Sequence, residues 1–372
     1  MNKAILLAVL ATPLVSASGP AYVSSCCPGD CNAQADPALL IFAQALAQIH
    51  TLAVFAGGDR AHIVGETLGD YLAAHDPYSG FLTHDEYAAY AAMRDGSHAG
   101  IGADLERRRD GATFCYPFAQ GPAARAGIHA GEQLLAIDGQ RVRGKPLALL
   151  GALATGRPGT SVRLTIADAR GVAREVRVAR ERVDEPPVSE YAIGAMHVLK
   201  VTDFTPSTPG EVKAALAHWD SDAPIVIDLR DCGGGDFYAA VDTAMLFLAE
   251  GVPIAFVIRR DATQAYASTT AGLSLRQPVF LWQGEHTASA AELFIGALTD
   301  NGRATTVGRT SAGKGSRQDI VPLSDGSALI MTTGYLATPR GVRFDGHGLA
   351  PQRPVAEGAV TAIYQQATAT TE

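Results

Sequence analysis

Between residues 225 and 307 the chain alternates short apolar runs with helix-forming segments. This alternation limits the fold more than any other feature. The apolar runs are Ile225–Leu229, Val279–Trp282 and Ala304–Val307, and the helical segments are Tyr238–Glu250 and Ser289–Thr299. Short, mostly apolar runs are typical of buried strands, and strands that alternate with helices form layered sheets. We therefore predict a layered α/β core for residues 185–355.

Residues 98–184 have a different pattern of short strands and turns. The stretch "AGIGADLE" predicts a strand entered through glycines, and Asp138-Gly139 predicts a hairpin turn. Pro146–Ala154 predicts a short helix, and "DEPP" at Asp184–Pro187 predicts the boundary with the α/β core. These features indicate a separate, β-rich domain.

The first 17 residues resemble an export signal. Lys3 gives a positive start, an apolar run follows from Ala4 to Val15, and Ser16-Ala17 supplies small residues for cleavage. The run is shorter than the roughly 20 residues that a membrane span needs. We therefore expect an exported protein, periplasmic or associated with the cell envelope. The alternative to cleavage of a simple export signal is lipidation at Cys26, in "VSSC".

Residues 18–97 are expected to form a helical N-terminal region. Ala38–Gly58 carries no charge, and because Gln44 and Gln48 interrupt it we predict a buried helix rather than a membrane span. Thr83 and Glu86 have the spacing of a capping box that opens another helix.

The cysteines and the net charge restrict the classes of partner and site. Five cysteines are present, and the cluster "CCPGDC" at residues 26–31 can hold one disulfide in an exported protein. That cluster has too few ligands for a metal site, so no metal is expected. A net charge of −8 without any basic run argues against nucleic-acid binding.

Lys314 lies in "VGRTSAGKGSRQ", which is close to two known motifs. The spacing from Gly308 to Lys314 is that of a phosphate-binding loop, but Gly315 stands where a Ser or Thr should hold magnesium. Ser311 and Lys314 have the S-x-x-K spacing of some serine hydrolases, but the S-D-N and K-T-G partners of that motif are absent. A third interpretation is that Lys314 is a solvated lysine in a turn.

Ser289 is a second candidate nucleophile, at the junction of a predicted strand and a predicted helix. Free N–H groups at a helix N-terminus can stabilise negative charge, although Ser289 can equally be a simple N-cap. No G-x-S-x-G motif occurs. The base could be a histidine, such as His286 in an esterase-like triad, or a desolvated lysine.

Several motifs together resemble the C-terminal processing (tail-specific) serine peptidases. These are "TASAAE" around Ser289, "GKG" with Lys314 25 residues later, "DLRDCGGGD", "AHDPYSGFL", "GIGADL" and "GHGLAP". The likeness covers about residues 60–355, in order and with similar spacing. Cys232-Gly233 and Ser311-Ala312 depart from the family pattern.

The resemblance implies a Ser/Lys dyad on a ClpP/crotonase-like core, without any cofactor. Ser289 would be the nucleophile, Lys314 the general base, and Gln318 the residue that orients the lysine amine. The N–H groups of Ala290 and of Gly234 or Gly235 would form the oxyanion hole.

The resemblance also implies that residues 98–184 are a PDZ domain, which adds a peptide as an extra strand. Its carboxylate-binding loop would be formed by Gly100, Ile101, Gly102 and Ala103. The expected partners are proteins or peptides with accessible C-termini, and a second copy of the chain through the N-terminal helices. Residues 356–372 would be a C-terminal tail. The competing interpretation is an inactive, peptide-binding protein on the same fold.

Overall fold

The computed structural model describes most of the chain from residue 37 onward. The described residues are 37–52, 60–93, 99–107, 111–118, 120–182, 186–194, 196–219, 224–273, 276–356, 358 and 361–369. The expected export signal at 1–17, Cys26 and the cysteine cluster lie outside them. Among the described helices, none has the length and apolar character needed to cross a membrane.

The centre of the α/β core is a six-stranded sheet. Its strands, in spatial order, are β17 (Arg353–Pro354), β14 (Ala304–Gly308), β13 (Val279–Gln283), β10 (Ile225–Asp228), β9 (Met196–Val201) and β8 (Val188–Ile193). All neighbours are parallel except the β8–β9 pair. The predicted layered α/β core is confirmed.

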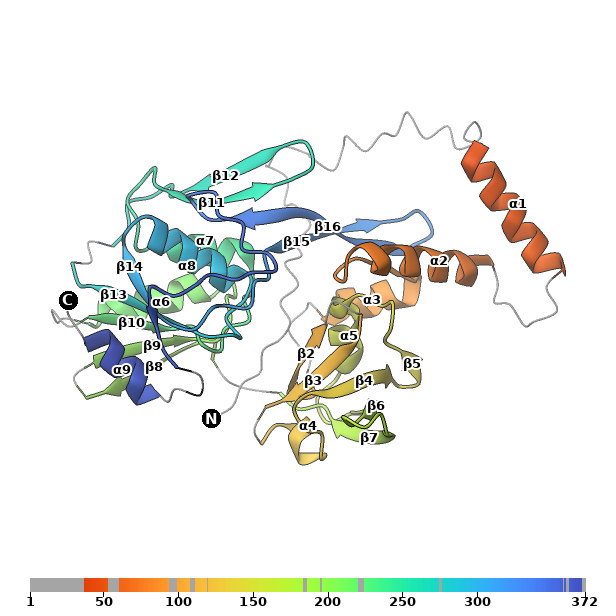
Figure 1. The fold of residues 1–372 in the computed structure, drawn as a ribbon, viewed down its shortest axis with the longest axis horizontal. Helices are drawn as coiled ribbons and strands as arrows, with labels where there is room; N and C mark the ends of the chain where they lie inside the picture. Colours follow the sequence, from red (N-terminus) through yellow and green to blue (C-terminus); the bar gives the residue numbers. More distant parts are fainter. Residues whose placement is uncertain are drawn as a thin grey trace.

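Helices cover both faces of this sheet (Figure 1). On one face lie α6 (Thr208–Ala217), α7 (Phe237–Met245) and α8 (Ala290–Asp300), packed on residues such as Ile225, Ile227 and Leu281. The intervening residues Val226 and Phe280 point to the opposite face, where they cluster with Tyr364 of α9 (Thr361–Ala369). The expected tail at 356–372 thus contains a helix that packs on the core.

A second sheet joins the α/β core to the N-terminal region (Figure 1). It consists of β1 (Gly80–Leu82), β16 (Ala328–Ala337), β11 (Pro253–Ile258) and β12 (Thr263–Ala267), with β15 (Ser316–Pro322) paired to β16. The β1–β16 pair is antiparallel, with Phe81 opposite Leu329. Residues just after the second helix are therefore held beside β16, the strand to which β15 also pairs.

The β-rich domain is a five-stranded antiparallel sheet with a short hairpin strand. Its strands are β2 (Ala103–Arg107), β3 (Thr113–Pro117), β4 (Glu132–Ile137), β6 (Ser161–Ala167) and β7 (Ala173–Ala179), with β5 (Gln140–Arg141) paired to β4. The helices are α4 (Pro122–Arg125) and α5 (Leu147–Ala154). Asp138 and Gly139 have φ of 46° and 83°, which confirms the predicted turn. Among the described strands, β2 pairs only with β3 and is therefore an edge strand.

The N-terminal region contains α1 (Pro37–Leu52), α2 (Arg60–His75) and α3 (His84–Met93). The capping box is confirmed, because the Thr83 N–H donates to Glu86 at 2.9 Å and the Glu86 N–H donates to the Thr83 hydroxyl at 3.3 Å. The prediction of a buried first helix is wrong. Ile41 is 67% exposed, since α1 projects from the rest of the molecule, with α2 beside it (Figure 1).

Candidate active site

Ser289 lies between β13 and the first turn of α8. Its φ of 57° and ψ of −117° are unusual for a residue with a side chain, and such conformations cost on the order of 1–3 kcal/mol. The preceding turn is fixed by the Ala288 N–H, which donates to the Cys232 carbonyl at 3.0 Å, and by the Thr287 hydroxyl, which donates to the Leu229 carbonyl at 2.8 Å. The tight turn therefore holds the serine in a strained position.

The Ser289 side chain is completely buried, and its hydroxyl makes no hydrogen bond within the described part of the chain. A buried hydroxyl without a partner is costly, and such exceptions occur where a group is kept for a reaction. His286 is exposed. The esterase-like alternative, which needs a histidine bonded to the serine, is therefore not supported by the geometry.

Lys314 lies near the end of the loop that connects β14 to β15. Its ammonium nitrogen lies 5.9 Å from the centre of the Tyr78 ring, and Tyr78 is in the turn after α2. Burial lowers the pKa of Lys314 to about 8, although the charge of Glu292 opposes this shift. A strand follows Lys314 rather than a helix, so the phosphate-loop interpretation does not fit.

The carboxylate of Glu292 joins the serine helix to the lysine loop. One oxygen, Oε2, accepts the backbone N–H of Ser289 at 2.8 Å and that of Lys314 at 2.9 Å. The other, Oε1, accepts the Gly313 N–H at 2.7 Å and the Ser311 hydroxyl at 2.6 Å. A single side chain thus fixes the backbone of both dyad candidates.

Burial raises the pKa of Glu292 to about 6, while its four hydrogen bonds act in the opposite direction. Sequence reasoning missed this residue. The S-x-x-E spacing of Ser289 and Glu292, which is that of a capping box, was the signal that could have identified it.

The Ser311 hydroxyl takes part in hydrogen bonds that hold the lysine loop in place. Besides donating to Glu292, its hydroxyl accepts the Leu349 N–H at 2.7 Å, so it links the lysine loop to the "GHGLAP" segment. A serine engaged in two short hydrogen bonds is a poor candidate for a nucleophile. The S-x-x-K interpretation of Ser311 and Lys314 is therefore disfavoured.

Gln318 lies on β15, four residues after Lys314. Its amide nitrogen donates to the Ser316 hydroxyl at 3.0 Å and to the Thr332 hydroxyl at 3.1 Å. Thr332 in turn donates to Asp76 at 2.6 Å. These bonds fix the amide and connect it to the turn that carries Tyr78.

Gly234 packs directly against the serine turn. Its φ is 118°, and a Cβ atom at this position would lie 2.8 Å from the Ser289 Cβ and 3.1 Å from the Ala290 nitrogen. Its carbonyl accepts the Phe204 N–H at 2.8 Å, whereas the N–H groups of Gly234 and Gly235 donate to no backbone carbonyl among the described residues. The predicted oxyanion residues Gly234 and Ala290 are therefore adjacent.

The thiol of Cys232 in the same loop is free and buried, and burial raises its pKa well above the ordinary value. It is therefore a protonated packing group, like the buried Cys115. No cluster of three or more metal-binding side chains occurs in the described part of the chain.

The predicted carboxylate loop leads into edge strand β2. The Gly100 N–H donates to the Glu181 carbonyl at 3.1 Å and is not available to a ligand. Gly102 has a φ of 66°, and a Cβ there would meet Pro122 at 2.5 Å. The N–H groups of Ile101 and Gly102 donate to no backbone carbonyl among the described residues.

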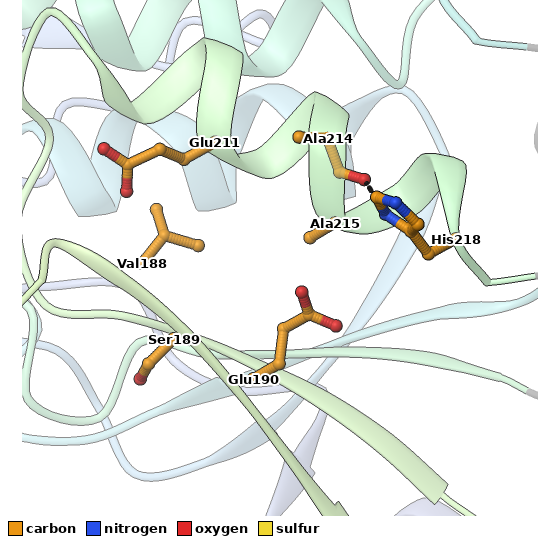
Figure 2. A pocket seen from close by; sticks show the side chains of 7 residues that line it. All are labelled: Val188, Ser189, Glu190, Glu211, Ala214, Ala215 and His218. Atoms are coloured by element: carbon orange, nitrogen blue, oxygen red, sulfur yellow. Dashed lines mark hydrogen bonds between the residues drawn. The ribbon is translucent and has the colours of Figure 1, made fainter.

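A cavity of about 280 Å³ lies elsewhere, between β8 and α6 (Figure 2). Its polar lining is Ser189, Glu190, Glu211 and His218. The His218 Nδ1 lies 2.6 Å from the Ala214 carbonyl oxygen (Figure 2). None of the lining residues belongs to the predicted site.

Family models match both globular parts of the chain. Residues 195–355 match peptidase family S41, and residues 117–168 match the PDZ domain. A probable CtpA-like serine protease of Staphylococcus saprophyticus is 30% identical over 77% of this chain and 59% of its own length. One of Staphylococcus haemolyticus is 31% identical over 76% and 57%. The chain thus spans less than two thirds of these relatives.

The fold resembles that of the photosystem II D1 C-terminal processing protease. The TM-score is 0.69 and the sequence identity is 24%, over 85% of this chain and 92% of that protein. At this identity the likeness concerns the fold. Together with the two family matches, it confirms the predicted arrangement of N-terminal helices, a PDZ domain and an α/β peptidase core.

Proposed function

Because this chain carries a PDZ domain and a peptidase domain of family S41, we propose that it is a serine endopeptidase that cleaves proteins or peptides near their C-termini. The observation that most supports the proposal is the Glu292 carboxylate, which holds the backbones of Ser289 and Lys314 on one oxygen. The proposal is supported because this carboxylate holds the backbone N–H of a strained, buried serine and that of a lysine of lowered pKa.

In the proposed reaction, the neutral Lys314 amine removes the proton from the Ser289 hydroxyl. The serine oxygen attacks the peptide carbonyl carbon, and the N–H groups of Ala290 and of Gly234 or Gly235 stabilise the oxyanion. Lys314 then gives its proton to the leaving amine, and water hydrolyses the acyl-enzyme. The Ser289 hydroxyl has no hydrogen bond to the described residues, so the lysine amine must approach it when substrate binds.

The test is cleavage of a denatured protein with an apolar C-terminus, followed by mass spectrometry of the fragments. Wild type should cut, and Ser289→Ala should fold normally but lose activity by a factor on the order of 10⁴ or more. Near-normal cleavage by Ser289→Ala would show that another residue is the nucleophile. Binding without cleavage by wild type would favour the inactive, peptide-binding alternative.

We propose further that a second copy of the chain covers the exposed apolar side chains of α1. Leu40, Ile41 and Leu52 are 50%, 67% and 70% exposed, and exposed apolar patches commonly mark interfaces. Sedimentation of wild type and of Ile41→Glu tests this proposal. Wild type should form a dimer that the charged variant weakens, whereas a monomeric wild type would refute it.

A further inference from the structure

A buried arginine lies three residues beyond Lys314 on β15. The Arg317 side chain is only 4% exposed, yet its Nε and Nη1 atoms have no hydrogen-bond partner among the described residues, and Nε has only a 3.6 Å ion pair with Asp319. A charged group removed from water without hydrogen-bond partners is strongly unfavourable. Native proteins keep few such groups, so this guanidinium calls for an explanation in terms of a ligand.

The nearby carboxylate of Asp319 forms an ion pair with this arginine but no hydrogen bond. Asp319 Oδ1 lies 3.6 Å from Arg317 Nε, beyond hydrogen-bond distance. Its other oxygen, Oδ2, already accepts from Arg259 at 2.9 Å and from the Thr333 hydroxyl at 2.6 Å. One carboxylate is therefore shared by two guanidinium groups, and the cluster retains a positive charge.

Aromatic residues form the wall around the guanidinium. The Arg317 carbon Cζ lies 5.1 Å from the centre of the Phe237 ring. Tyr266 and Tyr238 contact the same ring edge-on, at 4.7 and 5.2 Å. Tyr238 is 41% exposed, so solvent reaches the outer side of this cluster.

The cluster is directly connected to the proposed active site through the glycine loop at Gly234 and through the lysine loop. Phe237 is the first residue of α7 and follows Gly234 by three positions and Gly235 by two. Arg317 follows Lys314 by three positions. The contact between Phe237 and Arg317 thus lies where the chain leaves the oxyanion loop and the lysine loop.

We propose that Arg317 binds a carboxylate of the substrate, so that it determines specificity at the site whose peptidase function is proposed above. A guanidinium is suited to carboxylates because its N–H groups can bind them with two parallel hydrogen bonds. The carboxylate is either an Asp or Glu side chain near the scissile bond or the free C-terminus. Displacement of the exposed Tyr238 ring would give it access.

The test uses peptides that differ only in charge. One series replaces Asp by Asn at each position flanking the cut, and a second compares free with amidated C-termini. Wild type should prefer the charged peptide by about 10- to 100-fold in kcat/KM, and Arg317→Met should lose that preference while it still cuts the neutral peptide. Arg353→Met is a matched control, because Arg353 also lies over a phenyl ring, that of Phe280, at 5.3 Å.

A binding measurement keeps this inference separate from the peptidase proposal. Calorimetry with Ser289→Ala should show tighter binding of the Asp peptide than of the Asn peptide, both with amidated C-termini so that the PDZ loop does not contribute, and the double variant with Arg317→Met should not discriminate between them. Arg317→Met should also melt at or above the wild-type temperature, since it removes an unsatisfied buried charge. Equal discrimination with and without Arg317, or none in wild type, overturns the inference. Absence of cleavage alone overturns only the peptidase proposal.

Discussion

The Glu292 carboxylate accepts a 2.6 Å hydrogen bond from the hydroxyl of Ser311. The two residues belong to different segments, the first turn of α8 and the loop that ends at Lys314. Because the same carboxylate also accepts the N–H groups of Ser289 and Lys314, it acts as a structural link between nucleophile and base. The stability of this link and the proposed activity should therefore change together.

Glu292→Gln should be more damaging than Ser311→Ala. The amide retains one acceptor oxygen and places an NH₂ group against two donors, so at least two hydrogen bonds to a charged acceptor are lost. We expect about 3 kcal/mol or more of destabilisation by urea unfolding, together with a large loss of kcat/KM. Ser311→Ala should cost about 1–3 kcal/mol and keep activity within about tenfold. An inactive but stable Ser311→Ala would support the S-x-x-K interpretation instead.

The pH dependence of acylation should follow Lys314. Because the amine must be neutral to accept a proton, the rate should rise with pH through about 8 and then level off. Lys314→Arg keeps a charge that cannot be removed at these pH values and should be inactive. Single-turnover rates from pH 6 to 10 are the measurement. A rate that is independent of pH, or an active Lys314→Arg, would exclude the general-base role.

The lowered pKa of Lys314 should also make the stability of the protein depend on pH. Burial depresses the Lys314 pKa, so the unfolded chain binds more protons between pH 8 and 10.5 and stability should rise across this interval. The charged lysine costs about 3 kcal/mol at neutral pH. Lys314→Met should therefore be more stable than wild type near pH 7, by a margin that shrinks above pH 8. Chemical denaturation at several pH values measures the difference.

Gly234→Ala should abolish activity without unfolding the protein. The new Cβ would lie 2.8 Å from the Ser289 Cβ, and the φ of 118° is unfavourable for alanine. Loss of oxyanion geometry should lower kcat by about 10²-fold or more. Gly210→Ala in α6 is the control, since its Cβ would meet no atom within 4 Å and alanine favours a helix. Comparable losses in both variants would contradict the assignment.

Peptides with a free C-terminus should bind the PDZ domain better than amidated ones. The available N–H groups of Ile101 and Gly102 precede edge strand β2, which can accept a peptide as an added strand. Fluorescence anisotropy with labelled peptide pairs, using Ser289→Ala to prevent cleavage, should show about tenfold or greater discrimination. Equal affinities would remove carboxylate recognition from the proposal.

The sequence alone determined the layered α/β core, the β-rich domain and the turn at Asp138-Gly139. These features depend on local periodicity and turn chemistry, which short stretches encode directly. The motifs around Ser289 and Lys314 also identified the two dyad candidates, whose roles stay predictions. The sequence did not predict the exposure of α1, because a helix of apolar residues predicts burial whether or not a partner surface exists.

Only the tertiary structure decided which distant groups meet. Glu292 lies 22 positions before Lys314, and nothing in the local pattern shows that its carboxylate binds that backbone. The burial of the Arg317 guanidinium likewise depends on Phe237 from another loop. Hydrogen bonds and burial between remote segments follow from the order of strands in the sheet, since parallel strands bring their following loops to one edge. Local sequence preferences contain no information about that order.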